Sequence, residues 1–258
     1  MPEQLSAKRL TELKRLTELK GSYRYGLVLA LAVVSTCIQM LLPDTPASWL
    51  AQALLMAATV ITALFAEDAT RRQWRQVGVL VGIAVVGLIA AAIAGRGSTE
   101  RAIMFGLSGI LAVAGAVIVV RGVVGGIRSE QRVTLHSVMG ALTVYLLAGL
   151  IFAFSYSLMD ALASAPALSH IGSNKHAEEV YFSFITLTTV GYGDIAPVSA
   201  AARMTSVIEA LFGQLYLVTI VAVIVSNVGT QRVRMRRGAA SAGGDGGGEL
   251  VDAGEGTG

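Results

Sequence analysis

The sequence predicts an all-α membrane protein with six transmembrane helices. Hydrophobic residues make up 54 % of the chain and charged residues only 14 %, which is too apolar for a soluble domain of 258 residues. A helix needs about 20 apolar residues to cross a hydrocarbon core of about 30 Å. Six stretches meet that length: about 25–42, 48–66, 77–94, 102–120, 134–160 and 202–228.

Residues 1–24 precede the first span and predict an amphipathic cytoplasmic helix. The hexapeptide Arg-Leu-Thr-Glu-Leu-Lys occurs at 9–14 and again at 15–20, so leucines recur at helical spacing among charged residues. Such a helix lies on the anionic inner leaflet or packs against a neighbouring subunit. A solvated leader whose leucines contact their own subunit is the open alternative.

The positions of the basic residues predict the topology. Lysine and arginine are concentrated in the N-terminal segment, in the second and fourth loops and after the sixth span. By the positive-inside rule both termini are cytoplasmic, and the loop between the last two spans faces outside. The net charge of +3 therefore reflects a multi-pass protein of the plasma or inner membrane, and nucleic acid is not an expected partner.

Residues 188–194, called here the filter segment, read Thr-Thr-Val-Gly-Tyr-Gly-Asp and lie between the last two spans. This heptapeptide resembles the selectivity filter of the tetrameric potassium channel superfamily. Residues 134–230 resemble the ion-channel pore domain of its six-span, voltage-gated-like members. The resemblance implies an outer helix, a re-entrant pore helix at about 177–188, the filter and an inner helix, arranged around the axis of a homotetramer.

The glycines of the filter segment have a physical role in shaping its backbone. Filters of this kind present successive backbone carbonyls to a central axis, so that oxygen atoms replace the water around the cation. Carbonyls that point the same way require a backbone of alternating handedness, which Gly191 and Gly193 tolerate. The resemblance implies that Thr189, Val190, Gly191 and Tyr192 coordinate K⁺ as the permeant ion, with the Thr189 hydroxyl as a further ligand at the inner end.

The residues around the filter depart from the family pattern. A tryptophan pair precedes the filter in well-known relatives, whereas this chain has Tyr181 and Phe182 there. In some bacterial relatives a carboxylate side chain pairs with the filter aspartate. This chain has Ile185 at the position of that carboxylate. We expect Tyr181 to hold Asp194 behind the filter through its hydroxyl, and Thr188 to support the inner end.

Glu209 is the one carboxylate well inside a span, and an intramembrane ionisable group is a functional candidate. It either attracts cations from the cavity or supports the filter by bonding to pore-helix hydroxyls such as Ser183 or Thr186. Its depth, four residues before Gly213, favours filter support. Gly213 stands where similar channels have the hinge glycine of the inner helix, which implies a gating hinge, with close helix packing as the alternative.

The inner mouth of the pore is expected at Val225 and Asn227, in a segment that resembles the inner mouth of voltage-gated channels. Those channels have a Pro-Val-Pro kink before it, and this chain has Thr-Ile-Val-Ala at 219–222, which favours a straight helix crossing. Residues 231–258 predict a disordered, Gly-rich cytoplasmic tail that is too short to fold as a ligand-sensing domain.

Several other residues carry weaker expectations. Ser173 or Asn174 is expected to cap the pore helix. His170 and His176 are interpreted as surface-loop residues, with a pH sensor as the less favoured alternative. Cys37 is predicted to be a buried thiol. The sequence shows no catalytic dyad, nucleotide loop or metal-ligand cluster, which predicts a protein that is not an enzyme and has no cofactor besides the permeant K⁺.

The four-helix domain at 25–133 resembles a voltage sensor in span count only. The fourth span, 102–120, has no charged residue, and Arg121 and Arg128 lie at its inner end and beyond. Charges must move across the field to confer voltage dependence, so steep voltage gating is not expected.

The leading hypothesis is a potassium-selective homotetrameric channel that conducts K⁺ passively across the membrane. A nonselective cation channel is the nearest alternative. A potassium transporter subunit is less favoured, since such proteins repeat the helix-loop-helix unit four times and this chain has it once. A membrane sensor with a vestigial pore is the remaining alternative.

Overall fold

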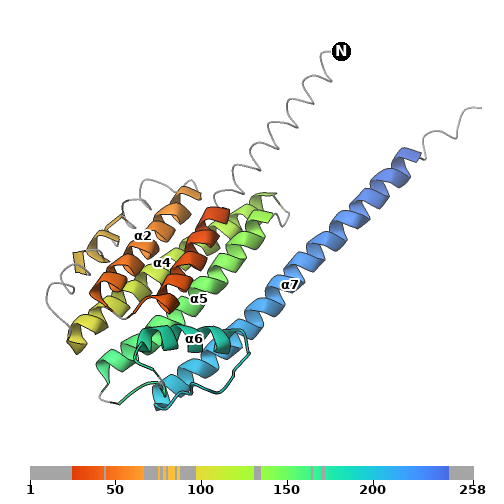
Figure 1. Ribbon diagram of the computed structural model, residues 1–258. Coiled ribbons are helices and arrows are strands. Elements are labelled where there is room, and N and C mark those ends of the chain that lie inside the picture. The colour runs from red at the N-terminus through yellow and green to blue at the C-terminus, as the bar shows by residue number, and fades with distance from the viewer. Residues whose placement is uncertain are drawn as a thin grey trace, which may run out of the picture. The chain divides into compact units, whose positions relative to one another are not determined.

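The computed structural model describes residues 25–43, 45–66, 97–130, 135–163, 165–169 and 172–243, with isolated residues between 75 and 87. These parts of the chain are helical apart from loops and one isolated β-bridge, between Leu168 and Pro197. The helices, shown in Figure 1, are Tyr25–Leu41, α2 (Pro46–Ala66), α4 (Ser98–Glu130), α5 (Leu135–Leu162), α6 (Lys175–Leu187) and α7 (Ala200–Gly243).

Three of these helices are long and apolar enough to cross a membrane: Ser98–Gly126 in α4, Ser137–Leu162 in α5 and Ala200–Val223 in α7. Two shorter apolar helices, Tyr25–Leu41 and Ala51–Ala66, lie before them. Most of the expected span 77–94 and the whole N-terminal segment 1–24 lie outside the described residues. The all-helical membrane architecture is confirmed, and the count of six spans stays a prediction.

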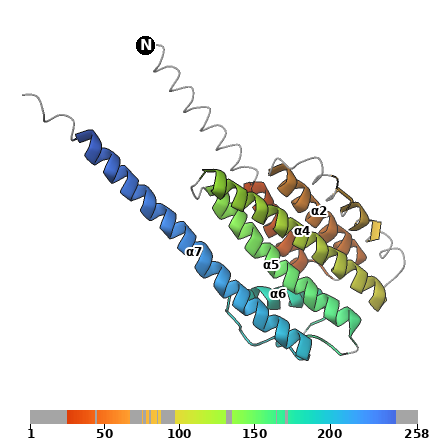
Figure 2. The ribbon, with the colours of Figure 1, turned by 180° about the vertical axis from the view of Figure 1, so that it is seen from behind.

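The helices before α6 pack into one bundle around a shared apolar core. One cluster of buried residues joins Val28 of the first helix, Val60 of α2, Val119 of α4 and Val144 of α5. Figure 2 shows α4 and α5 lying side by side, and Gly140 of α5 lies so close to α4 that an added Cβ would be 2.3 Å from the Val123 Cγ2. Close packing through small residues is the usual way in which membrane helices associate.

The prediction of a buried Cys37 is wrong. The residue is exposed on the helix Tyr25–Leu41, whose buried stripe contains Val28, Ala32, Ser35 and Gln39. These four residues follow one another at helical spacing, so Cys37 falls on the opposite face. The apolar span therefore predicted where the cysteine lies along the helix, but not which face of the helix carries it.

The short helix α6 starts and ends as its sequence predicts. Asn174 is the N-cap, and its side chain accepts a hydrogen bond from the Ala177 backbone N–H. Glu178 lies in the first turn, where negative charge favours the positive end of the helix dipole. Thr188 closes the helix by donating its backbone N–H to the Phe184 carbonyl at 3.0 Å.

The helix α7 is longer than the expected inner helix 202–228. It continues to Gly243, so residues 231–243 are helical, which corrects the prediction of a disordered tail for that part. Arginine, glutamine and methionine in this stretch are good helix formers, and the helix ends where the glycine-rich run begins. Residues 244–258 lie outside the described part. The chain divides into two compact units at Leu217 and Val218, and the candidate site belongs to the first.

Candidate functional site

The filter segment follows directly from the C-terminal end of α6, and its backbone alternates in handedness. Thr189 has a φ of 61°, Gly191 of 51° and Gly193 of 81°, whereas Val190 and Tyr192 between them do not have positive φ. Alternate left-handed residues are the geometry that points successive carbonyls to one side. The two glycines adopt it freely, and a β-branched threonine there is an outlier of the kind that occurs at functional sites.

The amide groups of the filter segment are turned back toward α6. The N–H groups of Val190 and Gly191 both donate to the Ile185 carbonyl, at 2.8 and 3.1 Å, and the N–H of Thr189 donates to Thr186 at 2.9 Å. Within the described part of the chain, no backbone hydrogen bond ends on a carbonyl of residues 189–193. These carbonyls are therefore free to act as ligands, which is unusual for backbone groups in an ordered protein.

The outer end of the filter segment is held by side chains. The Tyr181 hydroxyl donates to Asp194 Oδ2 at 2.9 Å, the pairing that the sequence suggested. Partial loss of solvent raises the pKa of Tyr181 above its ordinary value, and the hydrogen bond and charge of Asp194 act in the same direction. The phenol is thus held in its neutral, donating form. Beyond Asp194, the chain pairs with the loop before α6, where Ser169 donates its N–H to Ala196.

The inner end of α6 is anchored at Leu187. The Tyr145 hydroxyl, from α5, donates to the Leu187 carbonyl at 3.0 Å. Gly213 of α7 lies against the same group, so closely that an added Cβ would be 2.1 Å from the Leu187 oxygen. This contact accounts for a glycine at position 213 by close packing. The helix α7 is continuous through Gly213, and its role as a gating hinge stays a prediction.

Glu209 connects the three helices of the candidate pore. Its side chain is fully buried, Oε2 accepts a hydrogen bond from the Tyr156 hydroxyl of α5 at 2.8 Å, and Oε1 contacts the Ser183 hydroxyl of α6. Ser183 also lies 2.7 Å from the Gly149 carbonyl. The structure therefore places Glu209 between α7 and the rear of α6, the second of the two orientations considered from the sequence.

Part of the filter segment and one face of α7 are exposed on the chain. Tyr192 is 73 % exposed and Val190 51 %. On α7, one face carries Ala202, Glu209 and Gly213 against the rest of the chain. The opposite face is apolar and exposed, and it carries Met204, Val207, Ile208, Leu211 and Leu215.

Sequence reasoning missed several residues and misjudged one. Tyr145 and Tyr156 were treated only as parts of the apolar outer helix. Their hydroxyl groups could have revealed them, because a buried tyrosine hydroxyl needs a polar partner in the core. His176, interpreted as a surface-loop residue, is only 5 % exposed and lies within α6. His170 lies outside the described residues. Val225 and Asn227 lie on α7, and their side chains are not among those described.

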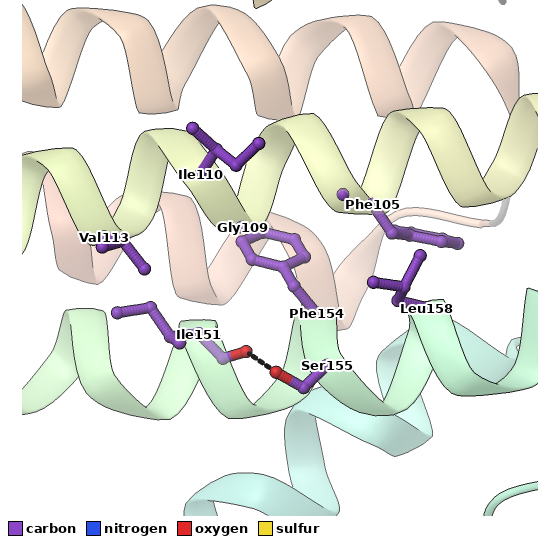
Figure 3. A pocket seen from close by; sticks show the side chains of 9 residues that line it. Phe105, Gly109, Ile110, Val113, Ile151, Phe154, Ser155 and Leu158 are labelled. Carbon is purple, nitrogen blue, oxygen red and sulfur yellow. Dashed lines mark hydrogen bonds between the residues drawn. The ribbon is translucent and has the colours of Figure 1, made fainter.

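A cavity of about 290 Å³ lies away from the filter segment, between α4 and α5 (Figure 3). Its walls are apolar and include Phe105, Ile110 and Val113 from α4 and Ile151, Phe154 and Leu158 from α5. The hydroxyl of Ser155 faces Ile151 and donates to its carbonyl at 2.8 Å, as the dashed line in Figure 3 marks. The residues that line the cavity therefore include no charged ligand for an ion. The filter segment remains the candidate ion-binding site.

Comparison with families of known proteins agrees with this location. Residues 140–229 match the model of a family described as "Ion channel", and the match runs from α5 through α6 and the filter segment into α7. No curated protein matches the chain. The apolar helices and the family match together indicate a membrane protein with an ion-channel domain.

Proposed function

We propose that the protein is a potassium-selective channel that conducts K⁺ passively across the plasma membrane as a homotetramer. The observation that carries the proposal is the backbone of the filter segment. Left-handed residues alternate at 189, 191 and 193, and the amides of residues 189–191 are donated back to α6. A row of backbone carbonyls without hydrogen-bond donors is the ligand type that replaces the hydration shell of K⁺ in selective pores.

The ligands of the proposed site follow from this backbone. The carbonyls of Thr189, Val190, Gly191 and Tyr192 coordinate K⁺, with the Thr189 hydroxyl at the inner end and Gly193 permitting the turn at the outer end. The sites are neutral dipoles, so K⁺ binds without an ion pair and can leave again. Conduction needs this balance, in which binding is favourable enough for entry and weak enough for exit.

A homotetramer follows from the single filter segment of each chain. One strand of carbonyls supplies only part of a coordination shell, and four copies around an axis complete it. The exposed side chains of Tyr192 and Val190 and the apolar face of α7 are surfaces that neighbouring copies would cover. The pore then opens outward, with both termini on the cytoplasmic side.

Steep voltage gating is not part of the proposal. The membrane-spanning part of α4 has no charged residue between Arg101 and Arg121. Moving one charge across the membrane contributes about 2.3 kcal/mol per 100 mV, and residues 102–120 of α4 carry no such charge.

Cation flux through the purified protein in liposomes tests the proposal. We expect K⁺ flux to exceed Na⁺ flux strongly and to depend little on voltage. Gly193→Ala places a Cβ at a φ of 81° and should abolish K⁺ flux, whereas Gly125→Ala, where an added Cβ meets nothing within 4 Å, should conduct like the wild type.

The other outcomes identify the competing functions. Equal passage of Na⁺ would show a nonselective cation channel, and steep voltage dependence would refute the assignment of α4. Flux that needs a second solute would show a transporter. No flux under any gradient would favour a sensor.

A further inference from the structure

A cluster of polar side chains is buried where the first helices of the chain meet the N-terminal end of α6. It consists of Gln39, Gln52, Ser157, His176 and Glu179, none of which is more than 5 % exposed. They come from four different elements: the helix Tyr25–Leu41, α2, α5 and α6. Polar groups are buried at a cost unless they are hydrogen-bonded, so their pairing specifies how these elements dock.

His176 is the centre of this cluster. Its Nε2 lies 3.2 Å from Gln39 Oε1 and 3.4 Å from Gln52 Nε2. The helix Tyr25–Leu41 and α2, called here the front helices, therefore both contact the same nitrogen. On the other side of the ring, Nδ1 lies 2.8 Å from Ser157 Oγ and 3.4 Å from Glu179 Oε2. Ser157 also donates to Glu179 Oε2, which connects α5 to α6 directly.

The His176 ring is also clamped by aromatic side chains. Phe105 of α4 stacks on it with a centroid distance of 4.9 Å, and Phe154 of α5 at 5.8 Å. A second link lies two residues away, where Asn174 donates its side-chain amide to the Leu42 carbonyl at 2.8 Å. The end of α6 farther from the filter is therefore fixed to the helix bundle, and the other end runs directly into the filter segment.

We propose that His176 is a positioning residue through which the helix Tyr25–Leu41 and α2 set the orientation of α6 and thereby the geometry of the filter. The inference rests on the proposed function, and it gives the front helices a role that needs no voltage-sensing charge. The short helix α6 is held at Leu187 by Tyr145 and Gly213, so a displacement of its His176 end turns it about the Leu187 end. A turn of α6 shifts the carbonyls of Ile185 and Thr186, to which the filter amides are bonded.

Hydrogen bonding rather than charge carries this coupling. The front helices present neutral amides to His176, and an amide can either donate or accept, so both tautomers of the imidazole find partners. Glu179, the charged member of the cluster, belongs to α6 itself, and the charged groups around the cluster are Arg101 from α4, Asp160 from α5 and Lys175 from α6. Lys175 and Asp160 are paired with each other at 3.3 Å.

The test compares variants of the cluster by K⁺ flux and K⁺/Na⁺ selectivity in liposomes. The double variant Gln39→Leu/Gln52→Leu removes the front-helix partners. His176→Phe keeps an aromatic ring between Phe105 and Phe154 but removes its hydrogen bonds. The matched control is Thr59→Val, because Thr59 is a buried polar residue of α2 whose hydroxyl donates to the Leu55 carbonyl of its own helix.

We expect the glutamine double variant and His176→Phe each to lower flux or selectivity about 5- to 150-fold, the typical range of coupling between two sites of one protein. The triple variant, which combines His176→Phe with both glutamine substitutions, should lower flux or selectivity no further than His176→Phe alone. The effects of residues that act through one another do not add. Thr59→Val should stay within about twofold of the wild type, as expected for a site outside the coupled network.

Wild-type conduction by the glutamine double variant would overturn the inference, as would full multiplication of the effects in the triple variant. Thermal unfolding in detergent shows which variants are folded, and the single variants Gln39→Leu and Gln52→Leu replace the double variant if it does not fold. A wild-type protein without K⁺ flux would contradict the proposed function instead. In that case thermal unfolding tests the docking through His176. Additive shifts in unfolding temperature by the glutamine and histidine variants would overturn the inference.

Discussion

Thr189 shows how much of this site is decided by single residues. It is the one non-glycine residue with positive φ in the described part of the chain, and the left-handed conformation costs such a residue about 1–2 kcal/mol. The hydrogen bonds of Thr189, Val190 and Gly191 to the end of α6 hold the strained backbone in place. Backbone strain at a candidate ion ligand supports a functional role for this segment.

Tyr181 is predicted to support the filter through its hydroxyl. Tyr181→Phe keeps the ring and its packing but leaves Asp194 without its phenol donor. We expect a folded channel with a smaller sustained K⁺ flux, because the outer end of the filter is less firmly held. Asp194→Asn should have a similar effect, and the double variant no larger one. Unchanged conductance and inactivation in Tyr181→Phe would refute the role.

The pH dependence of this support follows from the sign of the pKa shift. The pKa of Tyr181 is raised in the folded protein, so the donating form persists to higher pH there than in the unfolded chain. The contribution is fully present below the ordinary tyrosine value of about 10 and is lost as pH rises through the higher folded value. The difference in flux between wild type and Tyr181→Phe should be constant from about pH 7 to pH 9 and shrink only above about pH 10. A difference that disappears near neutral pH would contradict this assignment.

Glu209 is predicted to stabilise the pore more than to bind ions. Glu209→Gln keeps an oxygen that accepts from Tyr156, and it should cost about 0.5–1.5 kcal/mol of unfolding free energy. Glu209→Leu leaves the buried Tyr156 hydroxyl without its partner, and we expect this to cost about 1–3 kcal/mol, whereas the Ser183 hydroxyl can still donate to the Gly149 carbonyl. Thermal unfolding in detergent measures both, with Thr143→Val as the control, since Thr143 bonds only to its own helix. Equal stability of Glu209→Leu and wild type would exclude the structural role.

At the scale of elements, α6 is the part on which the others converge. Tyr145 of α5 and Gly213 of α7 hold its inner end, Glu209 holds its middle through Ser183, and His176 ties its outer end to the front helices. A short helix fixed at several points has little freedom to tilt. The filter backbone that follows it is thereby set by helix packing.

Gly213→Ala tests this packing. The added Cβ would lie 2.1 Å from the Leu187 oxygen, and the backbone of α6 or α7 must move to admit it. Overpacking of this kind costs about 1–3 kcal/mol. Gly125→Ala in α4 meets no such neighbour and should be neutral or stabilising by up to about 1 kcal/mol through helix propensity. If Gly213 served only as a hinge, Gly213→Ala would leave thermal unfolding unchanged and alter channel opening alone.

At the scale of the whole molecule, the proposed homotetramer makes a prediction about assembly. The apolar face of α7 and the side chain of Tyr192 are exposed, and large exposed apolar surfaces near a functional site mark places where partners pack. We expect light scattering of the solubilised protein to give four times the mass of one chain. Leu211→Asp places a charge on the exposed face of α7 and should weaken this assembly, whereas Ser206→Ala on the same helix should not. A monomeric wild type would contradict the tetramer.

The sequence by itself determined the class of protein. Apolar runs of membrane-spanning length require helices in lipid, the glycines of the filter segment permit a backbone of alternating handedness, and the capping residue expected at Ser173 or Asn174 predicts where α6 begins. These features are local, since each depends on a few neighbouring residues. The pairing of Tyr181 with Asp194 is also short in range, because Tyr181 lies within α6 and Asp194 only 13 residues later, at the end of the filter segment.

The tertiary structure decided which faces meet. The direction of Glu209, the burial of His176 and the exposure of Cys37 depend on how separate helices rotate and pack, and an apolar helix in a membrane carries little hydrophobic pattern to fix that rotation. Tyr145 and Tyr156 gained their roles in the same way, from partners 42 and 53 residues away in sequence. The site is therefore encoded locally in the filter segment and positioned by long-range contacts, because backbone geometry is set by neighbouring residues and helix orientation by packing.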